Sequence, residues 1–205
     1  NGAGATAIVN DGTGPLVFTS AVTSSDATNR AGDKTWVLGG TNADNNRIGP
    51  ILDTVSGSTN YSVVFVRKEG PGKWTLTGAS DYEGSTTINE GLLCVDGSIA
   101  GSGVIVNANG ALGGTGTVNA PVTGTGTIHP GHSAGVLTLS SLDLTGGAIA
   151  VDLDGPTAGN GAGHHGKLVV SGGAYWTSAT ALNVNLTYLP ASGQQFTVLE
   201  AGDMS

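Results

Sequence analysis

The sequence predicts an all-β protein built as a parallel β-helix, a β-solenoid in which short strands of successive coils stack on one another. Glycine supplies 36 of the 205 residues without a three-residue period, which disfavours long helices and excludes collagen. Runs of three to six β-type residues recur between turn residues, and no run has the pattern of a helix of ten residues or more. Near-repeats of glycine and threonine follow one another too closely for propeller blades or ordinary sandwich strands. A β-sandwich is the alternative fold.

The expected strands are short and rich in Val, Ile, Leu and Thr. Leu182, Val184 and Leu186 alternate with polar residues, so one side of that strand is expected to face the core and the other to face water. In chain order, strands are expected over residues 16–19, 35–38, 63–67, 73–77, 86–88, 92–95, 104–106, 115–118, 125–128, 136–139, 148–153, 168–171, 182–186 and 196–199.

The closest internal similarity lies between residues 98 and 128. Segments 101–104, 114–117 and 124–127 begin 13 and 10 residues apart (114 − 101 and 124 − 114) and read GSGV, GTGT and GTGT. Glycine is expected at the corners of coils, where positive φ is needed, and Thr and Val suit the stacked faces. With coils about 4.8 Å apart, roughly eight or nine coils would give a rod about 40 Å long.

The whole chain, residues 1–205, is expected to be one β-helix domain or segment, with a repeat core over 68–95 and 98–139. Two polar stretches, near residues 22–34 and 154–167, have weak strand patterns and are expected to be loops that project from the coils.

Composition also excludes several partners. The net charge is −8 and the seven Lys and Arg residues are scattered, so no nucleic acid or anionic lipid surface is an expected partner. No stretch approaches 18 consecutive apolar residues, so this segment is not expected to insert in a membrane.

The single cysteine, Cys94, excludes an internal disulfide. Because it lies in an apolar strand, a buried and inert thiol is expected there.

Four histidines are weak candidates for a zinc or copper site. His129 and His132 form one pair, and His164 and His165 form another. Neither pair has a cysteine or a supporting acid at a familiar spacing. The alternative interpretation is that these are solvent-facing turn residues.

Two carboxylates, Asp152 and Asp154, are weak candidates for a calcium site. Residues one apart on a strand face the same side, so these two could share an ion if coils above and below added oxygen ligands. A solvated strand end is the alternative. No cofactor is expected.

No catalytic residues are expected, and the chain is predicted not to be an enzyme. β-Helices that cleave polysaccharides use clustered aspartates with a Lys or Arg nearby. The 11 aspartates of this chain are spread from Asp11 to Asp203, mostly away from basic residues. Residues 131–135 read GHSAG and match G-x-S-x-G, but no helix is predicted after them, so a serine-nucleophile elbow is not expected.

One segment resembles a known repeat. Residues 68–95 read KEGPGKWTLTGASDYEGSTTINEGLLCV, which resembles the autotransporter-associated β-strand repeat, also called the passenger-associated transport repeat. Its pattern runs roughly K-x-G-x-G-x-W/L-x-L-x-G-x-N-x-Y-x-G-x-T-T-x-x-x-G-x-L-x-V. Ser80, Ser85 and Leu92 depart from that pattern at turn or surface positions. The family has a large apolar residue at the position of Trp74, so this residue is expected to fill the core.

The resemblance extends over about residues 35–200. Residues 38–53 look like the coil that precedes the repeat, and residues 126–137 look like a T-I-x-P-G-N-S-P-G-T-L coil with His132 and Ala134 in place of Asn and Pro. Residues 167–172 fit a D-x-L-x-V-x-G coil, except that Gly166 stands where Asp is common. The resemblance implies a right-handed, single-stranded parallel β-helix with Gly-rich turns. It also implies an exported passenger that is extracellular or on the cell surface of a Gram-negative-type bacterium.

The function expected on these grounds is a non-enzymatic structural rod. Its open strand edges would let copies stack end to end as a homo-oligomer or filament. The alternative is an adhesin-type passenger module that binds a glycan or host surface through its loops. A polysaccharide-cleaving enzyme is the least favoured hypothesis.

Overall fold

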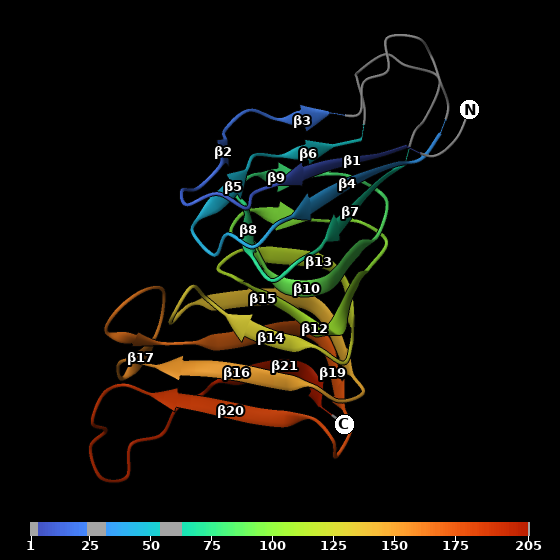
Figure 1. The fold of residues 1–205 in the computed structure, drawn as a ribbon. Helices are drawn as coiled ribbons and strands as arrows, with labels where there is room; N and C mark the ends of the chain where they lie inside the picture. The colour runs from blue at the N-terminus through green and yellow to red at the C-terminus, as the bar shows by residue number, and fades with distance from the viewer. Residues whose placement is uncertain (1–3, 24–31, 54–62, 205) are drawn as a thin grey trace.

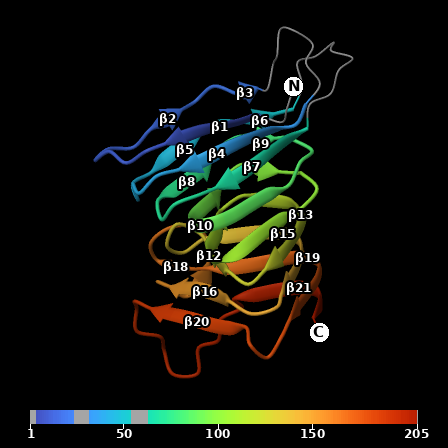
Figure 2. The same cartoon turned by 45° about the vertical axis from the view of Figure 1, so that its right-hand side comes forward.

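The computed structural model describes residues 4–23, 32–53 and 63–204, and these form a parallel β-helix without helices (Figure 1). The chain winds from one end of the stack to the other, so its two ends lie at opposite ends of the molecule (Figures 1 and 2). Successive coils pair in parallel through regular registers, which confirms the solenoid and rules out the β-sandwich alternative.

The strands form three faces, which we call A, B and C. Face A contains β1 (Gly4–Val9), β4 (Lys34–Gly39), β7 (Val64–Lys68), the first parts of β10 (Thr86–Val95) and β12 (Val104–Gly114), and the second parts of β13 (Thr117–Gly124), β15 (Val136–Leu144), β19 (Lys167–Trp176) and β21 (Leu199–Met204). Face B contains β2 (Val17–Phe18), β5 (Asn46–Ile48), β8 (Lys73–Leu76), the second parts of β10 and β12, β14 (Thr127–Pro130), β16 (Ala148–Leu153) and β20 (Ala181–Leu186).

Face C contains β3 (Val22–Thr23), β6 (Ile51–Leu52), β9 (Ala79–Ser80), β11 (Ser98–Ile99) and the first parts of β13, β15, β19 and β21. Long strands such as β10 bend at a corner and serve two faces, so 19 strands belong to one continuous sheet. The strand expected over residues 196–199 is wrong, because residues 196–198 have no strand structure and β21 begins at Leu199, where it pairs with Leu168.

Coil length varies along the stack. Gly4 pairs with Lys34, so that coil is 30 residues long (34 − 4), whereas Val104 pairs with Val122, so that coil is 18 residues long (122 − 104). The long coils near the C-terminal end carry their extra residues between face B and face C. The predicted loop near 154–167 lies there and contains two short paired strands, β17 (Thr157–Ala158) and β18 (His164–His165). The predicted loop near 22–34 lies mostly outside the described residues.

Apolar side chains stack in columns inside the coils. On face B, Trp74, Leu93, Leu112, Ile128 and Ile149 occupy equivalent positions of five successive coils, and all are buried. Trp74 is fully buried in this column and its indole N–H donates to the carbonyl of Gly39 at 3.0 Å. The prediction that Trp74 fills the core is therefore confirmed.

Lys68 is a charged residue within an apolar column. It is fully buried and is paired with Leu38 and Ile88, which are also buried. Its Nζ donates to three backbone carbonyls, those of Glu69, Gly70 and Glu90, at 2.9, 2.6 and 3.0 Å. Burial lowers the pKa of Lys68 to about 8, against the opposing effect of nearby carboxylates. The lysine thus satisfies carbonyl groups of two neighbouring coils that a leucine would leave unpaired.

Glycines line the corners for two different physical reasons. Gly91 has φ +70, a conformation that favours glycine, as the sequence predicts. Gly97 has no such φ, but a Cβ atom on it would collide with the carbonyl oxygen of Gly78 in the preceding coil. A Cβ atom on Gly116 would in turn collide with Gly97. Close approach of the coils, and not positive φ alone, therefore requires glycine at these corners.

We expect Gly97→Ala to destabilise the protein by about 2 kcal/mol, because the added methyl group must push two coils apart. Gly14→Ala is the matched control, since a Cβ atom on Gly14 meets nothing within 4 Å. The check is urea unfolding followed by far-UV circular dichroism. Equal midpoints for the two variants would contradict the close-approach explanation.

Candidate functional site

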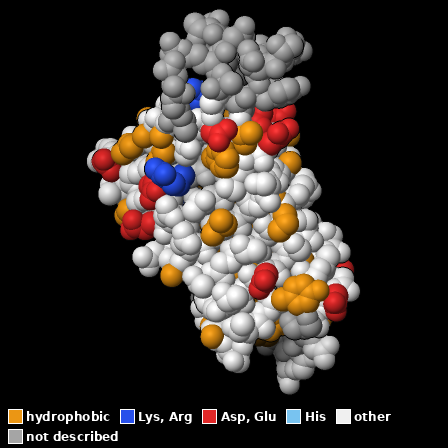
Figure 3. Space-filling view, turned by 90° about the vertical axis from the view of Figure 1, so that its right-hand side faces the viewer, with side chains coloured by type: hydrophobic (Ala, Val, Ile, Leu, Met, Phe, Trp, Pro, Cys, Tyr) orange, Lys and Arg blue, Asp and Glu red, His pale blue; other side chains and the backbone are white. Residues whose placement is uncertain are grey.

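All six predicted candidate residues come from β14, β16, β18 or the segments that follow β14 and β16. His129 lies on β14 and Asp152 on β16, while His132 and Asp154 follow those strands. The neighbouring coils therefore bring side chains together on and beside face B that are far apart in the sequence. Figure 3 shows one face of the molecule, which is mostly uncharged, with scattered acidic side chains and few Lys or Arg side chains.

His129 and Asp152 form a pair between adjacent coils. The His129 Nε2 atom lies 2.9 Å from Oδ2 of Asp152, and Nδ2 of Asn185 donates to the other carboxylate oxygen at 2.9 Å. Asp152 is buried. Side chains of two other coils thus already engage both of its oxygens, and the pair connects three levels of the stack.

Asp154 does not share a partner with Asp152. Its carboxylate accepts hydrogen bonds from the hydroxyl groups of Ser133, at 2.8 Å, and Thr187. These hydrogen bonds lower the pKa of Asp154. The two aspartates predicted to share a calcium ion are therefore directed to different hydrogen-bond donors in this structure.

The second histidine pair lies in the 154–166 segment. His165 is buried, neither of its ring nitrogens has a hydrogen-bond partner among the described residues, and its ring packs edge-on against Phe196 at 5.2 Å. The His164 ring lies against Gly159. Because neighbouring residues on a strand face opposite sides, the two rings do not converge on one ion. The interpretation of both histidines as solvent-facing turn residues is wrong for His165.

Within the part of the chain that the structure describes, no group of three or more His, Cys, Asp or Glu side chains is arranged to hold a metal ion. A metal site at the six candidates stays a prediction from the sequence.

No helix among the described residues is long and apolar enough to cross a membrane.

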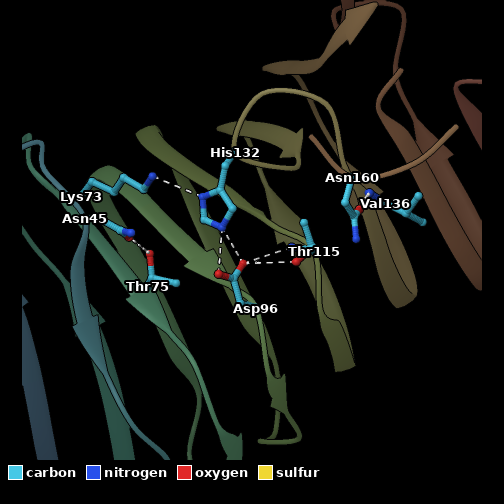
Figure 4. A network of polar contacts seen from close by, with 8 residues as sticks. All are labelled: Asn45, Lys73, Thr75, Asp96, Thr115, His132, Val136 and Asn160. Carbon is cyan, nitrogen blue, oxygen red and sulfur yellow. Dashed lines mark hydrogen bonds and ion pairs between the residues drawn. The ribbon is translucent and has the colours of Figure 1, made fainter. Parts of the chain in front are cut away.

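A further polar cluster is centred on His132, which lies in the turn after β14 (Figure 4). Nε2 of His132 lies 2.6 and 2.8 Å from the two carboxylate oxygens of Asp96, and Nδ1 lies 3.2 Å from Nζ of Lys73. Asp96 also accepts hydrogen bonds from the backbone and hydroxyl of Thr115. The cluster joins side chains from the neighbourhoods of β8, β10, β12 and β14.

The electrostatics of this cluster favour a closed ion pair. The hydrogen bond with Asp96, together with the side chain of Cys94, raises the pKa of His132 to about 9. Although partial burial works in the other direction, the bonds from His132 and Thr115 lower the pKa of Asp96. The Lys73 ammonium can only donate, so it binds Nδ1 only when the ring is neutral. Nε2 carries its hydrogen in either state, so the bond to Asp96 persists.

This arrangement does not provide a general base. With a pKa of about 9 the His132 ring is protonated at neutral pH and its Nε2 is bound to Asp96, so it is not free to accept a proton from the thiol of Cys94. Sequence reasoning missed Lys73 and Asp96 as partners of His132. The signal available in the sequence was the Gly113-Gly114 pair, because two residues without side chains leave room for a turn against the sheet.

Comparison with known proteins supports the repeat. Residues 66–93 match the passenger-associated-transport-repeat family. A stretch of 82 residues, 38% of this chain, is 43% identical to the adhesin BmaC autotransporter of Brucella suis biovar 1 (strain 1330), and covers 2% of it. Another match, of 71 residues and 34% of this chain, is 39% identical to an extracellular serine protease of Serratia marcescens and covers 7% of it. No solved structure matches the chain.

The chain therefore contains a passenger-associated transport repeat, as the motif at residues 68–95 predicted. The repeat is typical of passenger regions of secreted or cell-surface bacterial proteins. The chain spans only a small part of each of these curated relatives, one named as an adhesin and the other as a protease.

We expect the stabilising effect of His132 to depend on pH. Its pKa is raised on folding from 6.5 to about 9, so its contribution is complete below pH 6.5 and is lost as the pH rises through about 9. Because the pair is partly exposed, this contribution should be about 1 kcal/mol. Urea unfolding of the wild type and His132→Ala at pH 5.5, 7.5 and 10 measures it. A stability difference that is equal at pH 5.5 and pH 10 would contradict the assignment.

Proposed function

We propose that this chain is a non-enzymatic structural rod of an exported bacterial passenger, and that its ends join to further β-helix coils. In the isolated chain, a second copy supplies the next coil, so the rods stack end to end. The observation that carries the proposal is an apolar surface at the C-terminal end of the stack, which we call the C-terminal end face. It consists of Trp176, Leu182, Val184, Leu186 and Met204.

The residues of the C-terminal end face continue the core columns of the preceding coil. Leu182 and Val184 pair with Ile149 and Val151, which are buried, yet they are themselves 58% and 50% exposed. They are exposed because β20 pairs with β16 on one side only, and it lies at the end of the stack in both views (Figures 1 and 2). Apolar patches of this kind on a soluble protein mark contact surfaces.

The opposite end has complementary features. Among the described residues, β1 pairs with β4 and β2 pairs with β5, each on one side only, and Val17 and Phe18 are exposed there. Both ends thus present unpaired strand edges of the same parallel architecture. Contact between two different ends is heterologous and does not close, so it extends into a filament.

The test of end-to-end association is analytical ultracentrifugation over a concentration series, with electron microscopy of the most concentrated sample. Val184→Lys places a charge on the end face and should weaken association at least tenfold, because the ammonium would be buried in the contact. Asn183→Lys is the matched control on the outward side of the same strand and should associate as the wild type does. A wild type that stays monomeric at millimolar concentration would overturn the proposal of self-association.

A second candidate function, adhesion to a glycan or host surface, is favoured by the similarity to a protein named as an adhesin. The 154–166 segment offers a contact surface because Thr157 and Ala162 are exposed. The backbone of this segment is held to the turn after β14 by the bond from Gly161 N–H to the carbonyl of Ala134 at 2.9 Å. Such a fixed loop would bind with little loss of conformational entropy.

The adhesin proposal predicts that Thr157→Glu combined with Ala162→Glu reduces attachment to a glycan array or host cells at least tenfold. Thr123→Glu, at an exposed position on face A, is the control and should attach as the wild type does. Far-UV circular dichroism verifies that both proteins keep the β-rich fold. Equal attachment by the two variants would exclude a contact through this segment.

A further inference from the structure

Cys94 points away from the core. Its neighbours Leu93 and Val95 belong to the core cluster, whereas Cys94 does not, and its partners in the adjacent coils are Thr75 and Gly113. Alternation along a strand therefore places the thiol on the outer side of face B. Cys94 is nevertheless fully buried, so the prediction of a buried thiol is confirmed, but the apolar core is not what buries it.

The turn at residues 131–135 lies on that outer side. Gly131 exchanges two backbone hydrogen bonds with Gly114, of 2.8 and 3.2 Å, in an antiparallel bridge against the otherwise parallel sheet. A Cβ atom on Gly113 would lie 2.8 Å from the carbonyl oxygen of His129 and 3.4 Å from that of Gly131. The backbone of the turn thus folds back over Gly113, which pairs with Cys94 in the adjacent coil.

Bonds on two sides hold this turn in place. On one side, His132 binds Asp96 at 2.6 Å. On the other side, the segment that follows β16 binds the turn, since Asp154 accepts from Ser133 at 2.8 Å. In the same segment, Asn160 Oδ1 accepts at 2.9 Å from the N–H of Val136, the residue that follows the turn (Figure 4). Backbone bonds also hold the turn: the two between Gly131 and Gly114, and the one from Gly161 N–H to the Ala134 carbonyl. None of them belongs to the parallel ladders of the faces, so the turn can open while those ladders stay paired.

We infer that residues 131–135 form a strap that shields the thiol of Cys94 from thiol-reactive molecules, including other copies of the chain, and that release of the strap uncovers the thiol. The strap explains why a cysteine on the outer side of a sheet has no exposed surface. A thiol in that position would otherwise attack disulfides presented by neighbouring molecules. The inference rests on the geometry around Cys94 and does not depend on the proposed function.

The experiment measures the reaction of Cys94 with 5,5′-dithiobis(2-nitrobenzoic acid) under native conditions. The Cys94 thiolate attacks the disulfide of the reagent, a mixed disulfide forms, and one thionitrobenzoate leaves and is detected by its absorbance. Because Cys94 is the one cysteine of the chain, the signal reports this site alone. The wild type should react at least a hundredfold more slowly than the chain unfolded in urea.

Variants on the two sides of the strap distinguish two causes of faster labelling: opening of the strap, and the mere loss of the His132 ring. His132→Ala should accelerate labelling about tenfold. Asn160→Ala leaves the residues around Cys94 unchanged but frees the far side of the strap, and it should accelerate labelling about threefold. His129→Ala removes the nearby pair with Asp152, which is outside the strap, and should label as the wild type does. Local opening also predicts that low urea concentrations leave the labelling rates unchanged.

Three results would overturn the inference. The first is rapid labelling of the folded wild type. The second is wild-type rates in both His132→Ala and Asn160→Ala while circular dichroism shows the fold intact. The third is a labelling rate that rises with urea in proportion to global unfolding in every variant. If His132→Ala does not fold, Asp96→Asn is the substitute, since it weakens the same contact with almost no change in size, and its labelling rate is judged by the same criteria.

Discussion

The backbone of each coil stacks directly on the backbone of the next, about 4.8 Å away, and the rest of the structure depends on this spacing. At the corners, the spacing leaves no room for a Cβ atom between Gly78, Gly97 and Gly116. On the faces, it places equivalent side chains of successive coils in contact, so apolar residues form continuous columns inside. The high glycine content is therefore a consequence of stacking as much as of turn conformation.

The same spacing determines how polar groups are satisfied. Inside the coils, Lys68 replaces one apolar member of a column and donates to carbonyl groups of two coils. The Tyr82 hydroxyl, also buried, pairs with Thr86 at 2.6 Å. Outside, His129 binds an aspartate from the adjacent coil, and His132 binds one from two coils away. Side-chain bonds therefore connect coils in the direction of the stack, parallel to the backbone hydrogen bonds, and they secure the 131–135 turn without contributing to the core.

The strand pattern could be predicted from the sequence wherever a strand was long enough to show alternation or an apolar run. Residues 86–88 and 92–95 were expected as separate strands, but β10 runs through both, because its pairing with β12 resumes after a register shift between Ile88 and Glu90. The two-residue strands β6, β9 and β11 were not expected, because two residues carry no periodicity. They form because the coils above and below provide pairing partners.

The sequence by itself determined the fold class, the family of the repeat and the burial of Trp74 and Cys94, because composition and local spacing are properties of short segments. Only the tertiary structure decided which distant residues meet. His132 lies 36 residues from Asp96 (132 − 96) and 59 from Lys73 (132 − 73). These separations follow no fixed repeat, since the coils differ in length from one level to the next. Stacking, and not spacing in the sequence, therefore brought the turn, the carboxylate and the thiol together.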